Sequence, residues 1–387
     1  MARPISEFDV RCVSPTDLTS AEVDAWRAIQ AETPAFANPL FGPDFANAVA
    51  RVRSDVSVAV FSRSGCAEAF LAHHRRPSGF ARPIGAPFCD YHGLVARIGE
   101  GPQGTDAVAA AGLAAFRHSG LVDPGQVFDG LQDGSEAFAI ELDGGDAEGF
   151  LEAARAASPK KFKNWRRLRH RLEEDFGPLS LRVGRDAADF EQLLAWKREQ
   201  FVRTGVQDVL RPDWVAALMQ SLFELDTPHL SGLMLTLHAG ETLVGGHFGV
   251  RSGDIYHPWI ASTAPDLSAL SPGQAFLDQA VRAMPGLGLR VYDLGPGHDH
   301  YKRPFASTSR SLKAGLTSVP GMRGRLSASV DSAWMIAGVG RRPAVDKVRR
   351  RLDHIAASDP SLRGRIQGLA AAALATRRRS LSDQASH

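Results

Sequence analysis

Ionisable side chains are concentrated in one short stretch, RVYDLGPGHDHYKRPF, which spans residues 290–305. An apolar run leads into two glycines and then into acids, histidines, a tyrosine and a lysine. Ligands of open α/β sheets bind beyond the carboxyl ends of strands, which is where Asp293 is expected. Asp299, Tyr301 and Lys302 offer a base, a proton relay or a phosphate contact beside it. The stretch therefore predicts a site of proton-transfer chemistry.

The two histidines of this stretch, His298 and His300, alternate in the predicted loop. A metal site needs further ligands at a suitable spacing, and none follows nearby. The three cysteines, at positions 12, 66 and 89, also lack a metal-ligand or disulfide spacing. We therefore expect solvated histidines, reduced thiols and no bound metal.

A second candidate site is the start of a predicted helix, SPGQAFLDQAVRAM, at residues 271–284. Free backbone N–H groups and the helix dipole favour a phosphate or pyrophosphate at such an end. Gly273 would allow a ligand to approach the backbone closely. No Gly-Lys-Ser/Thr follows, so the motif is not a P-loop. The alternative is an ordinary helix start without a ligand.

The first half of the chain contains a similar polar group in the stretch PFCDYHG. Asp90, Tyr91 and His92 follow a Gly/Pro-rich loop, at the position where a duplicated unit would place its own polar loop. We expect them to line an acceptor cleft between two domains. The alternative is a turn that contains a buried tyrosine.

The elements that must position these residues follow a repeated order, in which two helices precede a pair of strands. Helices are predicted at 17–32 and 39–52 before a hairpin at 56–75, and again at 190–201 and 213–225 before a hairpin at 230–253. A further helix is predicted at 106–117. The order predicts a mixed α/β (α+β) protein of two tandem units, at residues 1–150 and 178–320.

Two basic segments lie outside the repeat. Residues 151–177 form a predicted linker helix whose basic side chains, among them Lys161, Arg166 and Arg167, exceed one face. Residues 321–387 form a basic, partly helical extension that ends in a stretch expected to be disordered. Both segments could bind a sugar diphosphate or anionic lipid. The arginines of the C-terminal extension could also bind a cyclic dinucleotide regulator. The alternative is a solvated surface.

The overall composition limits the classes of function. The net charge is only +2, and aromatic residues do not interleave with the basic runs, so we expect no general nucleic-acid binding. The N-terminus has no apolar signal core, and the longest apolar runs are too short to cross a bilayer. The sequence therefore predicts a cytoplasmic protein, with peripheral contact at the inner membrane as an alternative.

Several of these stretches together resemble the GNAT acyltransferases, in the branch of the FemAB-like and CelD/BcsL-type proteins of bacterial exopolysaccharide and holdfast loci. Leu270-Ser271-Pro272-Gly273 carries the resemblance, with Asp293-Leu294-Gly295, Gly297 and Tyr301-Lys302. The stretch LVGGHFGVRSGDIYHPWIAS and the linker RRLRHRLEE fit the same branch. NPLF and IGAPFCDYHG extend the resemblance faintly into the first half, so that it covers residues 5–318.

The resemblance implies two GNAT-like folds packed side by side, with acetyl-CoA as the donor substrate. Strands would part near residues 258–261 and Asp293, and the pantetheine arm would lie in the gap beside Ile260 and Ala261. The pyrophosphate would meet Ser271, Pro272, Gly273 and Gln274. The chain departs from the family in lacking a Gln/Arg-x-x-Gly-x-Gly/Ala loop.

Roles for the ionisable residues follow from the same resemblance. Direct transfer needs a base, for which Asp293 and Asp299 are alternatives. Tyr301 would protonate the leaving thiolate, and Lys302 would hold a phosphate or the acceptor.

Three functions remain open at this stage. The first is N-acetylation of an activated or lipid-linked amino sugar in an exopolysaccharide or cell-envelope precursor. The second is FemAB-type aminoacyl transfer from aminoacyl-tRNA. The third is a non-catalytic scaffold with a GNAT fold that senses a nucleotide.

Overall fold

The computed structural model describes residues 2–297 and 302–358, except for the side chains of residues 343 and 344. Asp299 and Tyr301, the histidines at 298 and 300, and the arginines at 377–379 lie outside the described residues.

The first half of the chain forms strands and helices in an order that the second half repeats. Its elements are β1 (Asp9–Val13), α1 (Ser20–Glu32), α2 (Pro43–Val52), β2 (Val56–Arg63), β3 (Cys66–Arg75), β4 (Phe80–Pro83), β5 (Val95–Ala96), α3 (Gly104–Ala110), β6 (Ala115–Leu121) and β7 (Gln132–Glu141). The Thr19 side chain caps α1, and Glu22 bonds back to the Thr19 backbone.

Two helices, α4 (Ala147–Ala157) and α5 (Pro159–Phe176), connect the halves. The second half then contains β8 (Leu179–Val183), α6 (Ala187–Thr204), α7 (Asp213–Glu224), β9 (Ser231–Ala239), β10 (Thr242–Ser252), β11 (Ile255–Thr263), α8 (Pro272–Ala283), β12 (Val291–Pro296) and β13 (Thr308–Ser318). Apart from β5, it matches the first half element by element, which confirms the predicted tandem α/β architecture.

One predicted helix, at 106–117, is wrong in its extent. The helix α3 ends at Ala110, and Gly112 then takes a left-handed conformation with φ of 67°. The residues from Ala115 onward form β6, because they pair with a strand of the other half. A pairing so distant in sequence leaves no local signal.

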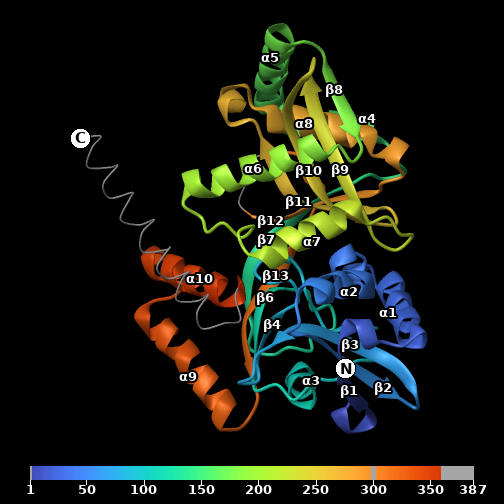
Figure 1. Cartoon of the computed structure of the whole chain (residues 1–387), viewed down its shortest axis with the longest axis vertical. Coiled ribbons are helices and arrows are strands. Elements are labelled where there is room, and N and C mark those ends of the chain that lie inside the picture. Colours follow the sequence, from blue (N-terminus) through green and yellow to red (C-terminus); the bar gives the residue numbers. More distant parts are fainter. Residues whose placement is uncertain (1, 298–301, 359–387) are drawn as a thin grey trace.

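All the strands belong to one continuous sheet, in which the two halves exchange their last strands. The order is β1-β2-β3-β4-β6-β13-β7-β12-β11-β10-β9-β8, with β5 paired to β3. The strand β13 of the second half lies between β6 and β7, and β7 of the first half pairs with β12. The exchange joins the halves at the middle of the molecule (Figure 1).

The sheet is buried on both faces. On one face, α1, α2, α6 and α7 share a single apolar core that contains Trp26, Phe45, Phe190 and Phe248. On the other face the cores are separate: α4, α5 and α8 pack on the second half around Phe276, and α3 packs on the first half. One face of the sheet therefore ties the halves together.

Two helices follow β13 within the described residues. They are α9 (Met322–Ala337) and α10 (Pro343–Ser358), and α9 lies beside β6 and β13 on the side away from α1 and α2 (Figure 1). This observation agrees with the predicted helical character of the basic extension.

We predict that neither half folds by itself. A fragment of residues 1–150 lacks β13 beside β6, and a fragment of residues 151–387 lacks β7 beside β12, so each has an unpaired central strand. Each fragment alone should show no cooperative thermal unfolding. The two fragments, refolded together, should form a 1:1 complex that unfolds in one transition, as measured by calorimetry and size-exclusion chromatography. Cooperative unfolding of the isolated 1–150 fragment would contradict this.

Candidate active site

The parallel strands β11 and β12 separate soon after they begin to pair. They pair only at Ile255 with Val291 and at Tyr256 with Tyr292. Pro258, just beyond, has no N–H to give to a ladder. The register with β10 shifts between Phe248 and Gly249, where β11 carries one extra residue. The strands thus part where the family resemblance implied, and His257 and Asp293 are the first residues beyond the last pair.

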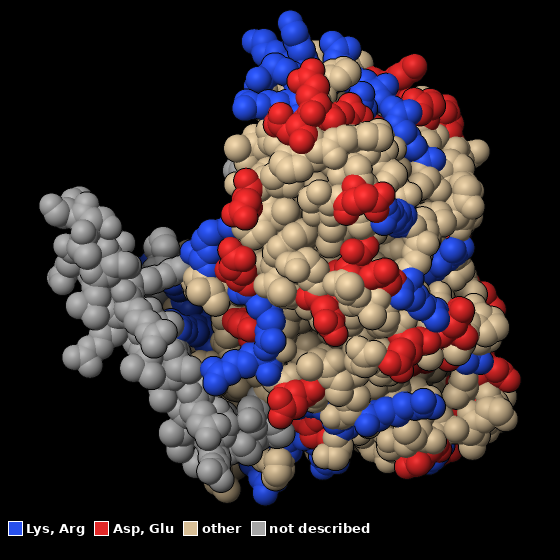
Figure 2. Space-filling model, turned by 45° about the horizontal axis from the view of Figure 1, so that its top comes forward, with Lys and Arg blue, Asp and Glu red and all other residues tan. Residues whose placement is uncertain are grey.

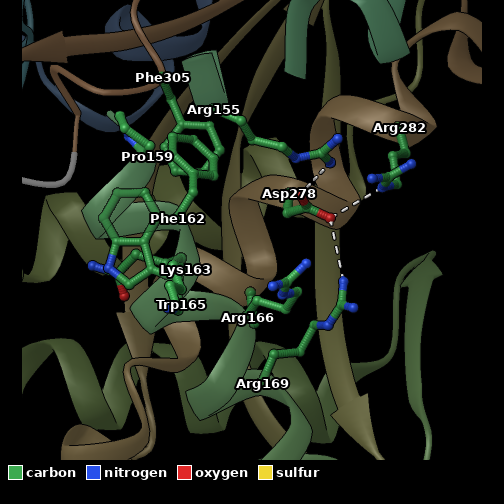
Figure 3. A pocket seen from close by; sticks show the side chains of 12 residues that line it. Arg155, Pro159, Phe162, Lys163, Trp165, Arg166, Arg169, Asp278, Arg282 and Phe305 are labelled. Carbon is green, nitrogen blue, oxygen red and sulfur yellow. Dashed lines mark hydrogen bonds and ion pairs between the residues drawn. The ribbon is translucent and has the colours of Figure 1, made fainter. Parts of the chain in front are cut away.

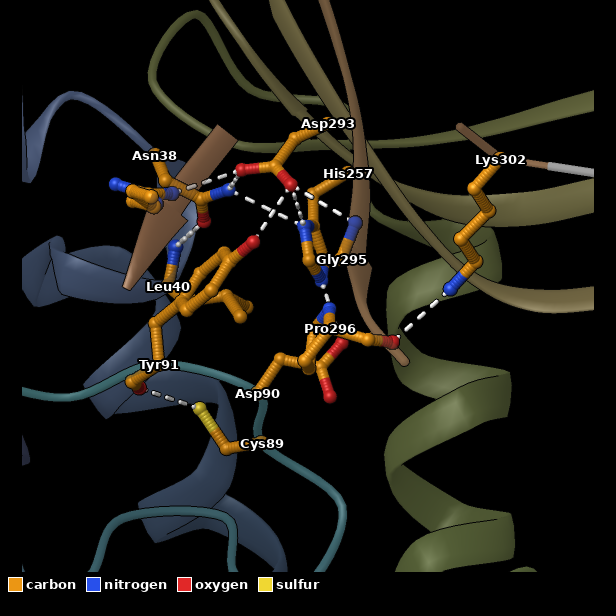
Figure 4. A network of polar contacts seen from close by, with 11 residues as sticks. Asn38, Leu40, Cys89, Asp90, Tyr91, His257, Asp293, Gly295, Pro296 and Lys302 are labelled. Carbon is orange, nitrogen blue, oxygen red and sulfur yellow. Dashed lines mark hydrogen bonds and ion pairs between the residues drawn. The ribbon is translucent and has the colours of Figure 1, made fainter. Parts of the chain in front are cut away.

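The Asp293 carboxylate is buried and accepts hydrogen bonds from both halves of the chain (Figure 4). One oxygen accepts from the Tyr91 hydroxyl at 2.7 Å and from the Gly295 N–H at 2.9 Å. The other accepts from the Asn38 amide and from the Arg310 guanidinium, both at 2.9 Å. A carboxylate with so many donors is strongly stabilised in its charged form.

The imidazole of His257 lies between two carboxylates. Its Nε2 is 3.1 Å from Asp90 Oδ2, and its Nδ1 is 3.6 Å from Asp293 Oδ1. Burial alone would lower its pKa, but the two carboxylates raise the pKa to about 9. Burial would likewise raise the pKa of Asp293, but His257 and Arg310 hold that pKa well below its usual range. At neutral pH the pair is an imidazolium beside a carboxylate.

The network meets solvent at Asp90. The Asp90 side chain is 32% exposed, whereas those of His257 and Asp293 are 0% and 5% exposed. Gly295 has φ of 71°, and a Cβ added to it would lie 3.0 Å from Asp90 Oδ2. Glycine is therefore needed here, both for its backbone conformation and for the close approach of Asp90.

Two of the residues proposed in the first half, Asp90 and Tyr91, join this network, together with Asp293. Burial and the charge of Asp293 raise the pKa of Tyr91, so its hydroxyl remains a donor. The guanidinium of Arg310 lies 4.2 Å from the centre of the Tyr91 ring.

Three further members of the network, Asn38, His257 and Arg310, were not predicted as site residues from the sequence. The His-Pro pair inside a strand was the signal that could have indicated His257.

Other proposed residues lie away from the network. The Lys302 ammonium donates to the Pro296 carbonyl at 3.0 Å and points away from Asp293 (Figure 4). His92 is buried against His118, with their ring nitrogens 3.0 Å apart, and burial lowers the pKa of His92 to about 3. The structure therefore places His92 in a buried histidine pair, whose second member, His118, contacts the Thr317 hydroxyl at 2.9 Å.

The predicted helix start is present as α8. Ser271 has a left-handed conformation before Pro272, the first residue of the helix, and its side chain makes no cap bond. A Cβ on Gly273 would meet only Thr263 Cγ2, at 3.6 Å. On the neighbouring strand β11, the Ile260 side chain is buried, and the Ala261 carbonyl accepts from Lys197 Nζ at 3.2 Å.

A pocket of about 480 Å³ lies between α4, α5 and α8 (Figure 3). Gln274 and Phe305 line it, and Trp165 stacks on Phe305 with ring centres 5.6 Å apart. The charged residues that line it are Arg155, Lys163, Arg166, Arg169, Asp278 and Arg282. Asp278 bonds to Arg282 at 3.0 Å and contacts Arg155 and Arg169 at 3.4 and 3.9 Å. The pocket is therefore positively charged and partly aromatic.

The positive charge continues onto the outer surface of α5. Figure 2 shows lysine and arginine side chains gathered at this end of the molecule. Of the residues proposed there, Arg166 lines the pocket. Lys161 and Arg167 are exposed, and Arg167 donates to the Asn164 side chain at 3.1 Å.

No described helix has the length and apolar character to cross a bilayer. No group of three or more His, Cys, Asp and Glu side chains within residues 2–297 and 302–358 is arranged to hold a metal ion.

Part of the chain is similar to a known domain family. Residues 159–303 match the family model of the acetyltransferase (GNAT) domain. This segment contains α5, β11, α8 and β12, so the parting of the strands and most of the residues that line the pocket lie in the part of the chain that is similar to the GNAT domain. No curated protein matches the chain.

Some solved structures can be superposed on most of this chain but have a low sequence identity to it. The C-terminal domain (DUF2156) of a putative lysylphosphatidylglycerol synthetase from Agrobacterium fabrum is 13% identical, with a TM-score of 0.48 over 81% of this chain and 96% of that one. A tandem GNAT protein from the clavulanic acid biosynthesis pathway is 12% identical, with a TM-score of 0.44 over 82% and 100%. FemX is 9% identical, with a TM-score of 0.46 over 71% and 90%.

The charge pair leads to a prediction about stability. Replacing Asp293 with asparagine leaves the His257 imidazolium without its buried partner and should lower the free energy of unfolding by about 3–5 kcal/mol. Because the folded pKa of His257 exceeds its ordinary value of 6.5, the pair stabilises the wild type fully below pH 6.5 and loses its effect as pH rises through about 9. The Asp293→Asn protein should lose less stability over that interval, as measured by urea unfolding.

The matched control is Asp254→Asn, which breaks an exposed ion pair with Arg290. It should cost no more than about 1 kcal/mol and leave the pH dependence between 6.5 and 9 unchanged. Equal pH profiles for wild type and Asp293→Asn would show that His257 is not held protonated by this carboxylate.

Proposed function

We propose that the protein transfers an acyl group from a coenzyme A thioester to an amine or hydroxyl of an acceptor. The observation that carries this proposal is the parting of β11 and β12 inside the GNAT domain, with a polar network at its base. Beyond Tyr256, the backbone N–H and C=O groups of β11 make no ladder hydrogen bonds to β12 and could bind a ligand. The thioester would lie in this gap, with its carbonyl near the first residues beyond Tyr256.

The donor's phosphates would bind at the start of α8 and in the neighbouring pocket. The helix end supplies free N–H groups and a partial positive charge. The pocket supplies Lys163, Arg166 and the arginines around Asp278, beside Gln274 of the first helical turn. Both features favour a ligand with several negative charges. In this arrangement Ser271, Pro272 and Gly273 contact the donor through the backbone.

Asp90 would bind the acceptor. It carries the most exposed carboxylate of the network, so it can accept a hydrogen bond from an acceptor N–H or O–H. As the acceptor attacks the thioester carbonyl, its proton passes to Asp90 or to water, and the departing thiolate is protonated. Asp293 fixes the direction of His257 and Tyr91 and takes no proton, because its pKa is held low. The roles of Asp299 as an alternative base, of Tyr301 as the proton donor to the leaving thiolate, and of Lys302 as a contact for a phosphate or the acceptor stay predictions.

The acceptor that we propose is an amino sugar of a bacterial exopolysaccharide or cell-envelope precursor, and the reaction is N-acetylation. The support is chemical. An activated or lipid-linked sugar carries a diphosphate, and the exposed lysines and arginines of α5 provide a surface for it.

A second candidate reaction is aminoacyl transfer from aminoacyl-tRNA. The observation that favours it is the spread of positive charge around the outer surface of α5, which would suit an RNA backbone. The two candidates differ in their donor, and donor binding therefore separates them.

The first test is isothermal titration calorimetry with acetyl-CoA. The wild type should bind it saturably, and Gly273→Asp should weaken binding at least about tenfold, because a carboxylate at the helix start repels phosphate. Gly273→Ala is the matched control. A Cβ there has only an ordinary contact with Thr263, so Gly273→Ala should bind as the wild type does.

Other outcomes would change the assignment. Equal binding by wild type and Gly273→Asp would move the donor away from α8. No binding of acetyl-CoA, with tight binding of charged tRNA, would favour aminoacyl transfer. No binding of either donor, with binding of a nucleotide, would favour a scaffold without catalysis.

A second prediction concerns Asp90. Gly295→Ala should raise the acceptor KM at least about tenfold, because a Cβ 3.0 Å from Asp90 Oδ2 displaces that carboxylate. Gly253→Ala is the control, because Gly253 also has positive φ but a Cβ there would meet no atom within 4 Å. Both variants should lose about 1–2 kcal/mol of stability through the strained backbone. A raised KM in both variants, or in neither, would remove Asp90 from the acceptor site.

A further inference from the structure

The helix α9 presents its apolar side chains to solvent. Met322, Leu326 and Ile336 have exposed fractions of 88%, 67% and 87%, and Val330 is 54% exposed. The alanines at 333 and 337 are exposed as well. At 100° per residue these positions fall on one side of the helix. We call this set of six residues the α9 stripe.

The opposite side of α9, which faces the protein, carries Gly324, Ala328, Asp331 and Met335. The Asp331 carboxylate accepts a hydrogen bond from Arg117 of β6 at 2.7 Å and another from Arg349 of α10. Gly324 also faces inward, and a Cβ there would lie 1.9 Å from the Val319 carbonyl oxygen. The helix is therefore attached mainly through the Asp331 carboxylate and close backbone contact, while most of its large apolar residues remain outside. A helix that packs on a soluble core normally has the reverse orientation.

Positive charge borders the α9 stripe. Arg323 and Arg325 are exposed, and their positions in the helix lie on either side of it. On the adjoining turn and on α10, further exposed cations are Arg341, Arg342, Lys347 and Arg350. The nearby carboxylates are engaged: Asp331 as above, Asp353 with Arg82, and Asp346 with the Gly340 N–H. Apolar side chains flanked by cations are typical of helices that lie in the surface of an anionic membrane.

We propose that α9 docks on an anionic lipid surface, with the α9 stripe inserted among the acyl chains and Arg323 and Arg325 at the phosphates. A second copy of the chain fits less well, because it would bring the same arginines against themselves. A peptide partner also fits less well, because α9 projects from the body of the molecule as a ridge (Figure 1). The inference is independent of the proposed reaction, since it uses none of its residues.

The test is co-sedimentation of the full chain with vesicles. The wild type should bind vesicles of phosphatidylcholine and phosphatidylglycerol, and should bind much less to vesicles of phosphatidylcholine alone or at raised salt. A variant with Leu326→Gln, Val330→Gln and Ile336→Gln should lose at least about tenfold in binding to the anionic vesicles. Glutamine keeps good helix propensity, so the circular dichroism spectrum and melting temperature should stay the same.

The matched control changes three exposed apolar residues elsewhere: Ile98→Gln, Val202→Gln and Val206→Gln. These side chains are 66%, 75% and 52% exposed. The control should bind anionic vesicles as the wild type does. A separate variant, Arg323→Gln with Arg325→Gln, should weaken binding and reduce its salt dependence.

Three results would overturn the proposal. They are the absence of vesicle binding by the wild type, equal binding by the wild type and the α9 stripe variant, and equal losses in the α9 stripe variant and the control. Light scattering on the free protein gives a further criterion. A wild-type dimer that the α9 stripe variant dissolves, without vesicle binding by either, would identify a second copy as the occupant.

Discussion

The exchange of β7 and β13 between the halves is the constraint on which the rest of the structure depends. Each strand completes the sheet of the half to which it does not belong in sequence, and the two strands pair with each other at the centre. The exchange fixes the position of one half against the other. It also carries Arg310, on β13, to a place beside Tyr91 of the first half and Asp293 of the second. The polar network is thus a property of the complete chain.

Charge balance explains how that network tolerates burial. Two carboxylates, Asp90 and Asp293, face two cations, His257 and Arg310. Removing charges from water is costly unless each is paired and hydrogen-bonded, and Asp293 satisfies both conditions. Within the network, the side chains of Asp90 and Arg310 reach solvent, and each is 32% exposed. The buried part therefore provides a rigid electrostatic support for the exposed carboxylate.

The sequence predicts those features that depend on residues close together in the chain. Helix starts such as the one at Pro272 depend on neighbouring residues, and the repeated order of helices and strands is visible as periodicity. Asp293 at a strand end and Asp90 and Tyr91 in a loop follow from the same local patterns. The strand exchange leaves no such signal, because β6 pairs with residues almost two hundred positions away. Asn38 and Arg310 were missed for this reason, since their role exists only after the halves have joined.

The order of the strands also has a consequence for the synthesis of the chain. The strand β6 emerges from the ribosome early, but its partner β13 emerges only after nearly all of the second half. Until then the central edge of the first half remains an open template for pairing with other chains. The nascent protein is consequently most prone to aggregation between the completion of α3 and the release of residue 318. The first half can therefore complete its sheet only after residue 318 has left the ribosome.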